Sequence, residues 1–240
     1  MSLAGQLEHA RRARTAIEDL IAHPELLGPD LEPIRRVSDG LLVGHKATGR
    51  GKPGTEVADT MTLLEGAKSL GLVERLDWAF RCHTFGVALA RTDIGELHLT
   101  PEPETFGSAC PPRLAEMWSR GRRELDVVAE LHEDAFADLA TLRSACYEMR
   151  GWGWRFAVAD LADHPTVVEQ LTWIQPTYVE VDLADIRRLD KSSVQAWVSA
   201  GRAAGAGILA VRVDSEAART AARAGGADLT RSSVALAESG

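Results

Sequence analysis

A chain of 240 residues with 45% hydrophobic and 26% charged side chains can bury a large core and is too apolar to be disordered, so we expect one domain over residues 1–240. Its net charge of −8 argues against a broad nucleic-acid-binding face or a polybasic membrane anchor, since both need a positive field. Three cysteines without CxxC spacing indicate neither a disulfide framework nor a zinc site. With no signal-peptide pattern and no membrane-length apolar run, the protein is expected to be cytoplasmic.

The first expected element is an amphipathic helix. Apolar residues recur at intervals of three and four between Leu3 and Ile21, and the pattern ends at "AHPELLGP". We expect this helix, within residues 1–26, to pack on the barrel described below. Two apolar runs follow, "LEPIRRV" and "GLLVGHKAT", and the Asp39-Gly40 pair between them is typical of a hairpin turn. These runs are predicted to form an antiparallel pair of strands.

A glycine-rich stretch then raises the question of a phosphate-binding loop. Its glycines fit a GxGxxG pattern: Gly49, Gly51 and Gly54. A dinucleotide fold needs a strand ending in an acidic residue after the next helix. Here a helix with Thr55 as its N-cap and Gly71 at its end is predicted, and a second helix, "VERLDWAFRCHTFGVALAR", follows it. Because Pro53 would also remove a backbone donor, a nucleotide loop is disfavoured.

From Gly95 onward the expected strands and helices alternate. The strand segments are "GELHLTPEP", "ELDVVAELHE", "WRFAVAD", "TYVEVDL", "GILAVRV" and "ADLT". Such alternation indicates parallel strands joined by helical crossovers, because a tight turn cannot reach a parallel neighbour. With the hairpin the total is about eight strands, which favours a closed (β/α)8 barrel over an open doubly wound sheet.

Polar residues occupy the carboxyl ends of most expected strands, where parallel barrels carry their chemistry. They are Lys46, Arg50, Thr100, Glu130, Glu133, Asp160, Glu180, Asp182, Arg212, Asp214 and Arg231. Strand ends meet solvent in any barrel, which accounts for many of them. That explanation suits Glu130 less well, because Glu130 shares a face of its apolar strand with Val128.

The order of these residues resembles the EAL-domain family, the cyclic di-GMP phosphodiesterases and their non-catalytic relatives, from about Leu31 to Arg231. The segments that carry the resemblance are "EPI" at 32–34, "AKSLGLVERLDWAF" at 67–80, "TYVEVD" at 177–182 and "GGAD" at 225–228. The resemblance implies an α/β fold, a modified (β/α)8 TIM-like barrel with one antiparallel strand. It also implies that active members bind two divalent metals, usually magnesium or manganese, and hydrolyse one phosphodiester bond.

Matched to this family position by position, the sequence has a degenerate site. The Glu-Ala-Leu signature reads Lys46, Ala47, Thr48, so that a lysine replaces a metal-binding glutamate. Positions that depart from the family pattern are Lys46, Thr100, Ala159, Glu180 and Val211. Positions that could still bind a ligand, if binding is retained, are Arg50, Glu130, Asp160, Asp182, Arg212 and Arg231.

The physical consequence is the loss of an oxygen-ligand cage. Two-metal hydrolysis needs such a cage to hold both cations and to generate hydroxide. We therefore expect no bound metal, no other cofactor and no catalytic residue. We also expect Lys46 to pair with Glu130, Glu180 or Asp160, because burying these acids unpaired would cost several kcal/mol.

Four functions remain open. The favoured one is a non-catalytic regulatory or interaction protein whose partners are unknown proteins, with no nucleic acid and no membrane involved. The second is a non-hydrolysing cyclic di-GMP receptor. The others are an active phosphodiesterase and a barrel enzyme with a new chemistry built on Glu130, Glu133, Asp160 and Asp182. The resemblance alone makes a homodimer plausible.

Overall fold

The structure, a computed structural model, describes residues 3–51, 53–55, 57–159, 165–182 and 191–232. The chain forms two compact units. One comprises Met1–Leu31, Ala47–Thr92 and Pro101–Leu125, and the other comprises Glu32–Lys46, Asp93–Thr100 and Asp126–Gly240. None of the helices in the described part of the chain is long and apolar enough to cross a membrane.

Eight strands in the described residues close into a barrel in chain order. They are β1 Gly28–Arg36, β2 Leu42–Arg50, β3 Glu96–Leu99, β4 Asp126–Leu131, β5 Arg155–Val158, β6 Tyr178–Asp182, β7 Gly207–Val211 and β8 Leu229–Arg231. Strands β2 to β8 run parallel, and β1 pairs antiparallel with β8, with Ile34 opposite Arg231. The predicted modified barrel with one antiparallel strand is confirmed.

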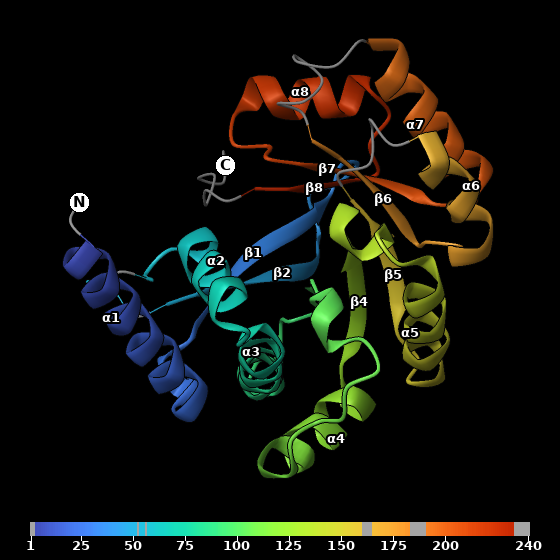
Figure 1. Cartoon of the computed structure of the whole chain (residues 1–240). Helices are drawn as coiled ribbons and strands as arrows, with labels where there is room; N and C mark the ends of the chain where they lie inside the picture. The colour runs from blue at the N-terminus through green and yellow to red at the C-terminus, as the bar shows by residue number, and fades with distance from the viewer. Residues whose placement is uncertain (1–2, 52, 56, 160–164, 183–190, 233–240) are drawn as a thin grey trace. The chain divides into compact units, whose positions relative to one another are not determined.

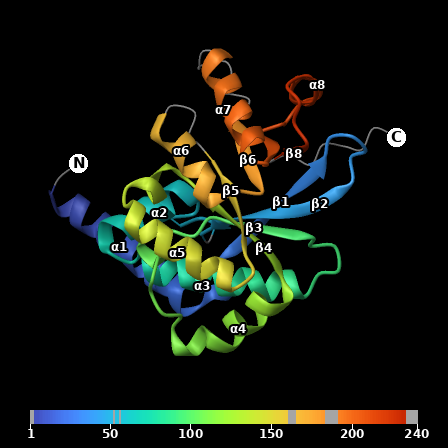
Figure 2. The ribbon, with the colours of Figure 1, turned by 90° about the vertical axis from the view of Figure 1, so that its right-hand side faces the viewer.

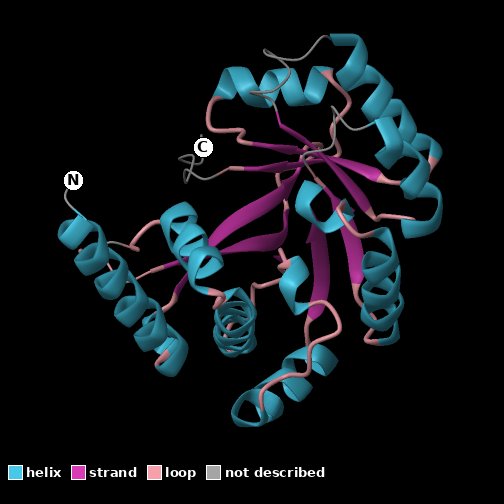
Figure 3. Cartoon of the chain, in the orientation of Figure 1, coloured by secondary structure: helices cyan, strands magenta, loops and turns pink. Residues whose placement is uncertain are grey.

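The helices of the second unit lie on the outer side of its strands (Figure 1). They are α5 Leu139–Gly151, α6 Pro165–Ile174, α7 Lys191–Ala203 and α8 Glu216–Ala224, with a short 3-10 helix at Glu133–Phe136. Figure 3 shows that strands and helices alternate along this part of the chain, as the sequence pattern predicts. The alternation points every parallel strand the same way, so their carboxyl ends meet at one end of the barrel.

The hairpin between β1 and β2 has the predicted turn. Gly40 has a φ of 71°, which a residue with a side chain rarely adopts, and the Asp39 carboxylate accepts a hydrogen bond from the Leu41 amide at 3.1 Å. The two strands run side by side in both views (Figures 1 and 2). Inside the barrel, Ile34 of β1 packs with three residues of β7 and β8, Leu209, Val211 and Leu229.

The other unit is mostly helical and also includes the start of β1 and the end of β2. It contains α1 Leu3–Ala22, α2 Thr60–Leu70, α3 Val73–Leu89, α4 Ala115–Glu124 and short 3-10 helices at Pro24–Leu26, Pro103–Thr105 and Pro112–Leu114. Helix α1 packs on α2 and α3 through a core that includes Ile17, Leu20, Leu63, Ala67 and Leu76. The expected N-terminal helix is present and buries its apolar face within this unit.

The predicted start of α2 at Thr55 is wrong, because Asp59 caps the helix. The Asp59 carboxylate accepts a hydrogen bond from the Thr62 amide at 2.9 Å, and Gly71 ends the helix with a φ of 65°, as predicted. Before the cap, the Gly51 amide donates to the Ala58 carbonyl at 3.1 Å, and a Cβ at position 51 would lie 1.9 Å from the Val57 carbonyl oxygen. Position 51 therefore needs a glycine, because the backbone at Val57 lies too close for a side chain.

Candidate functional site

Charged side chains gather at the carboxyl ends of the barrel strands in the second unit. Lys46 of β2, Glu130 of β4 and Glu180 of β6 are buried, and the side chain of Arg231 of β8 is 12% exposed. The barrel places them together because each belongs to a strand that points the same way, and period-two alternation turns them toward the interior. Buried charges of this kind persist only when they are paired.

Lys46 pairs with Glu130, as expected. Its ammonium donates hydrogen bonds to Oε2 of Glu130 and to the hydroxyl of Thr100 at the end of β3. The Thr100 hydroxyl also lies 3.3 Å from Nε2 of His132. Both members of the ion pair are shielded from water, since 8% of the Lys46 side chain and 0% of the Glu130 side chain is exposed.

Arg231 joins carboxylates from three strands. Its guanidinium donates to Oε1 of Glu130 at 2.8 Å and to the two oxygens of Glu180 at 3.3 and 3.1 Å. Its Nε lies 3.6 Å from a carboxylate oxygen of Glu32 on β1. The two oxygens of Glu130 are thus bonded to different cations, one to Lys46 and one to Arg231.

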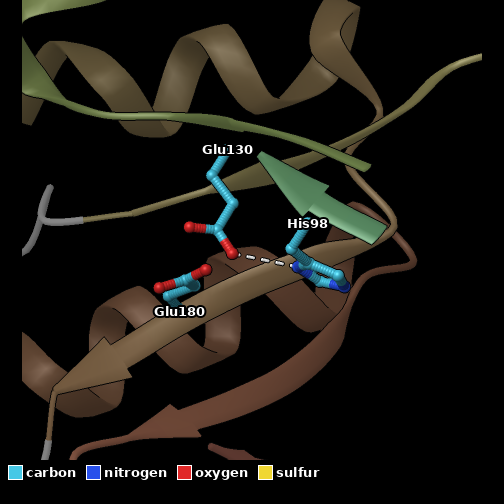
Figure 4. Close-up of side chains that lie close together, drawn as sticks. All are labelled: His98, Glu130 and Glu180. Carbon is cyan, nitrogen blue, oxygen red and sulfur yellow. Dashed lines mark hydrogen bonds and ion pairs between the residues drawn. The ribbon is translucent and has the colours of Figure 1, made fainter. Parts of the chain in front are cut away.

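His98 completes the cluster and was not among the predicted site residues. It is fully buried on β3, and its Nδ1 lies 3.0 Å from Oε1 of Glu130 (Figure 4). Its Nε2 lies 3.4 Å from Oε2 of Glu96. The alternation of side chains along a strand could have predicted that His98 faces the site. Glu96, His98 and Thr100 fall two residues apart, so the strand that was expected to contribute Thr100 also points these two inward.

The network continues from His98 toward the amino-terminal ends of the strands. Glu96 accepts hydrogen bonds from Arg155 at 3.0 Å and from the Tyr178 hydroxyl at 3.1 Å. Arg155 also donates to both oxygens of Asp126 at 2.7 Å. Burial, together with the adjacent Glu96 carboxylate, raises the pKa of Tyr178 to about 12. Oppositely charged groups therefore link the buried His98, through Glu96 and Arg155, to the exposed Asp126.

Neighbouring charges set the protonation of the buried acids. Burial alone would raise the pKa of Glu130, but Lys46 and Arg231 hold that pKa well below the usual range of a glutamate. Burial raises the pKa of Glu180 to about 7, against the opposing charge of Arg231 and with the help of the Glu130 carboxylate. Burial would lower the pKa of His98, but its hydrogen bonds to Glu130 and Glu96 raise it, which favours the imidazolium.

The remaining predicted residues form other ion pairs, belong to the other unit, carry no ligand atom or lie outside the described residues. Asp182, at the end of β6, pairs with Arg212, whose side chain is 56% exposed and whose φ is 56°. Arg50 belongs to the other unit, where its guanidinium lies 2.6 Å from the Asp30 carboxylate. Asp160 lies outside the described residues. Ala159 and Val211 are buried and carry no ligand atom.

One group in the described residues has the donor types and spacing of a metal site. Ligand atoms of His98, Glu130 and Glu180 lie within 4.8 Å of one another (Figure 4). Glu130 and Glu180 already accept hydrogen bonds from Arg231, and Glu130 also accepts one from Lys46. Any metal ion at this group would share its carboxylates with two protein cations.

Comparison with known protein families decides the identity of the domain. The profile of the EAL domain matches residues 13–231. The chain belongs to the EAL-domain family. EAL domains form the family of cyclic di-GMP phosphodiesterases, whose members bind or hydrolyse cyclic di-GMP and use divalent metals for the reaction. No curated protein matches the chain.

Solved EAL structures share the fold at low sequence identity. The EAL domain of FimX from Xanthomonas citri, in complex with c-di-GMP, is 13% identical with a TM-score of 0.78, over 95% of this chain and 94% of that one. PaMucR phosphodiesterase, in a c-di-GMP complex, is 16% identical with a TM-score of 0.72, over 94% of each chain. The Bacillus subtilis YkuI protein, in complex with substrate c-di-GMP and calcium, is 15% identical with a TM-score of 0.69, over 92% of this chain and 58% of that one.

Proposed function

We propose that this EAL domain does not hydrolyse cyclic di-GMP and acts as a regulatory module through contacts with other proteins. The observation that carries the proposal is the ion pair between Lys46 and Glu130 at the strand ends. By family resemblance, position 46 is that of a metal-binding glutamate. A lysine there replaces a ligand of the metal with a positive charge, which repels any cation beside it.

The residues of the cluster do not fit a pair of divalent ions. Metal-assisted hydrolysis needs oxygen ligands that are free to bind the ion and to lower the pKa of a bound water. Here Lys46 and Arg231 hold both oxygens of Glu130, and Arg231 holds those of Glu180. Ala159 and Val211, which by the family resemblance replace acidic residues of the site, are buried and offer no donor atom in their side chains. We therefore assign no catalytic residue.

A product assay tests this proposal. The purified protein is incubated with cyclic di-GMP and Mn²⁺ or Mg²⁺, and the linear dinucleotide is measured by chromatography. We expect no product above the level given by Glu130→Gln, which lacks the charged carboxylate. Product from the wild-type protein that disappears in Glu130→Gln would reject the proposal, because it would show turnover at this cluster.

A second candidate function is that of a non-hydrolysing cyclic di-GMP receptor. It is supported by the exposed guanidinium of Arg212 at the end of β7, held in a backbone conformation that a non-glycine residue seldom adopts. Such residues concentrate at ligand-binding positions. Against it, Glu180 places an acid where the family has a lysine that would meet a phosphate.

Calorimetry separates the two candidates. Heat on addition of cyclic di-GMP, with and without magnesium, that is lost in Arg212→Ala or Arg50→Ala would favour the receptor. No heat at about 1 mM ligand, a concentration that reveals even weak binding, would exclude the receptor and favour the interaction module.

Homodimerisation remains a prediction, and light scattering on the purified protein tests it.

A further inference from the structure

The surroundings of the Lys46 ammonium resemble those of a small bound cation. The ammonium contacts Oε2 of Glu130 and the hydroxyl oxygen of Thr100. A third donor atom is close to both of them, since Nε2 of His132 lies 3.3 Å from the Thr100 oxygen and 3.8 Å from Oε2 of Glu130. Three potential ligands, from the ends of β3 and β4, thus converge on one positively charged group.

We propose that Lys46 is the resident cation of this barrel and that its removal opens a divalent-cation site formed by Glu130, Thr100 and His132. The inference rests on the proposed function, in which the cluster holds no metal. It goes further by proposing that one side chain, that of Lys46, takes the place of a metal ion. A carboxylate, a hydroxyl and an imidazole are ligands that Mn²⁺ and related ions accept together.

The energetic reason lies in the burial of Glu130. Its carboxylate is fully buried, so Oε2 needs a positive partner once Lys46 is gone, while Oε1 keeps its contacts with Arg231 and His98. Leaving one oxygen of a buried carboxylate without its partner is strongly destabilising. A cation that enters from solvent can replace the ammonium, and the His132 side chain, which is 33% exposed, gives the position access to water.

Arg231 is not equivalent to Lys46. Its planar guanidinium contacts carboxylates of Glu130, Glu180 and Glu32, so a spherical ion could not meet all three at bonding distance without a rearrangement of the strands. Lys46, by contrast, is a compact point charge that contacts two oxygen atoms. The inference therefore predicts that a metal can replace Lys46 and that the loss of Arg231 is not rescued by a metal.

Thermal unfolding of three proteins, in EDTA and in about 1 mM Mn²⁺, tests the inference. Lys46→Gln removes the charge, and Lys46→Arg keeps it as the matched control. In EDTA we expect Lys46→Gln to unfold about 10 °C below wild type, because a buried ion pair is broken. In Mn²⁺ we expect it to recover roughly half of that loss, while wild type and Lys46→Arg stay unchanged.

The double variant Lys46→Gln with His132→Ala separates metal binding from a general effect of ions. It should show little or no stabilisation by Mn²⁺, because one of the three ligands is missing. If Lys46→Gln is unfolded in EDTA, refolding in Mn²⁺ gives the same test. Equal stabilisation of wild type, or no response in Lys46→Gln, would overturn the inference. Binding of Mn²⁺ would not by itself show hydrolysis of cyclic di-GMP. The product assay therefore tests the proposed function separately.

Discussion

Glu130 is the residue on which the barrel interior depends. Its carboxylate contacts Lys46, Arg231 and His98, and it is wholly removed from water. In low-dielectric surroundings such contacts are strong, but each partner also carries a large desolvation penalty. The pairs therefore matter less for the stability they add than for the cost of breaking one of them.

Removal of Arg231 should be far more damaging than removal of an exposed arginine. We expect Arg231→Gln to lower the free energy of unfolding by about 3–5 kcal/mol, because two buried glutamates lose a partner. Arg212→Gln, the matched control, breaks a pair whose arginine is 56% exposed and should cost at most about 1 kcal/mol. Urea denaturation measures both. Equal losses would contradict the assignment of Arg231 to the buried network.

The pH dependence of stability should carry the signature of Glu180. Burial raises its pKa from 4.5 to about 7, so between these pH values the folded protein retains a proton that the unfolded chain releases. Stability contributed by this group is therefore full below pH 4.5 and is lost as the pH rises toward 7. The loss is about 3 kcal/mol, since each unit of pKa difference corresponds to about 1.4 kcal/mol.

Glu180→Gln is the comparison that isolates this effect. Urea denaturation of both proteins at about pH 5 and pH 7 should show the wild type losing more stability than the variant over that interval. Glu130 affects stability at lower pH. Because its pKa is lowered in the folded protein, the stability that it contributes is lost only as the pH falls through the acid range. Parallel pH profiles of the two proteins would contradict the raised pKa of Glu180.

At the scale of elements, local sequence predicts most strands and helices, and it fails where two signals compete. Thr55 and Asp59 are both good caps, and the helical pattern begins close to each. The backbone hydrogen bond from the Gly51 amide to the Ala58 carbonyl fixes the chain directly before Asp59, which favours the later of the two caps. No sequence pattern predicts this hydrogen bond between two backbone groups.

The cap assignment has a direct test. Asp59→Ala should lower the free energy of unfolding by about 1 kcal/mol, because the amide of Thr62 loses its acceptor at the helix start. Thr55→Ala serves as the control and should cost less than half as much. Urea denaturation gives both values. A larger effect at Thr55 would mean that the helix begins earlier than described.

Across the whole molecule, the barrel was predictable and the interior network only in part. Alternating strands and helices indicate a parallel barrel, and strand ends indicate where charged residues gather. The pairing of Lys46 with Glu130 follows from that placement. The contacts of Arg231 with Glu180 and Glu130 do not, because strand order does not decide which of several carboxylates the long Arg231 side chain reaches across the barrel. Sequence spacing carries no information about such distances.

The central claim is that protein cations occupy the place of the metals in this EAL barrel. Electron paramagnetic resonance tests it most directly, because free Mn²⁺ gives a signal that diminishes when the ion binds to protein. Titration of Mn²⁺ into the wild-type protein, with Lys46→Gln beside it, should leave the free-ion signal undiminished in the wild type and reduce it in the variant. Loss of the signal with the wild-type protein, at one or more ions per chain, would contradict the claim.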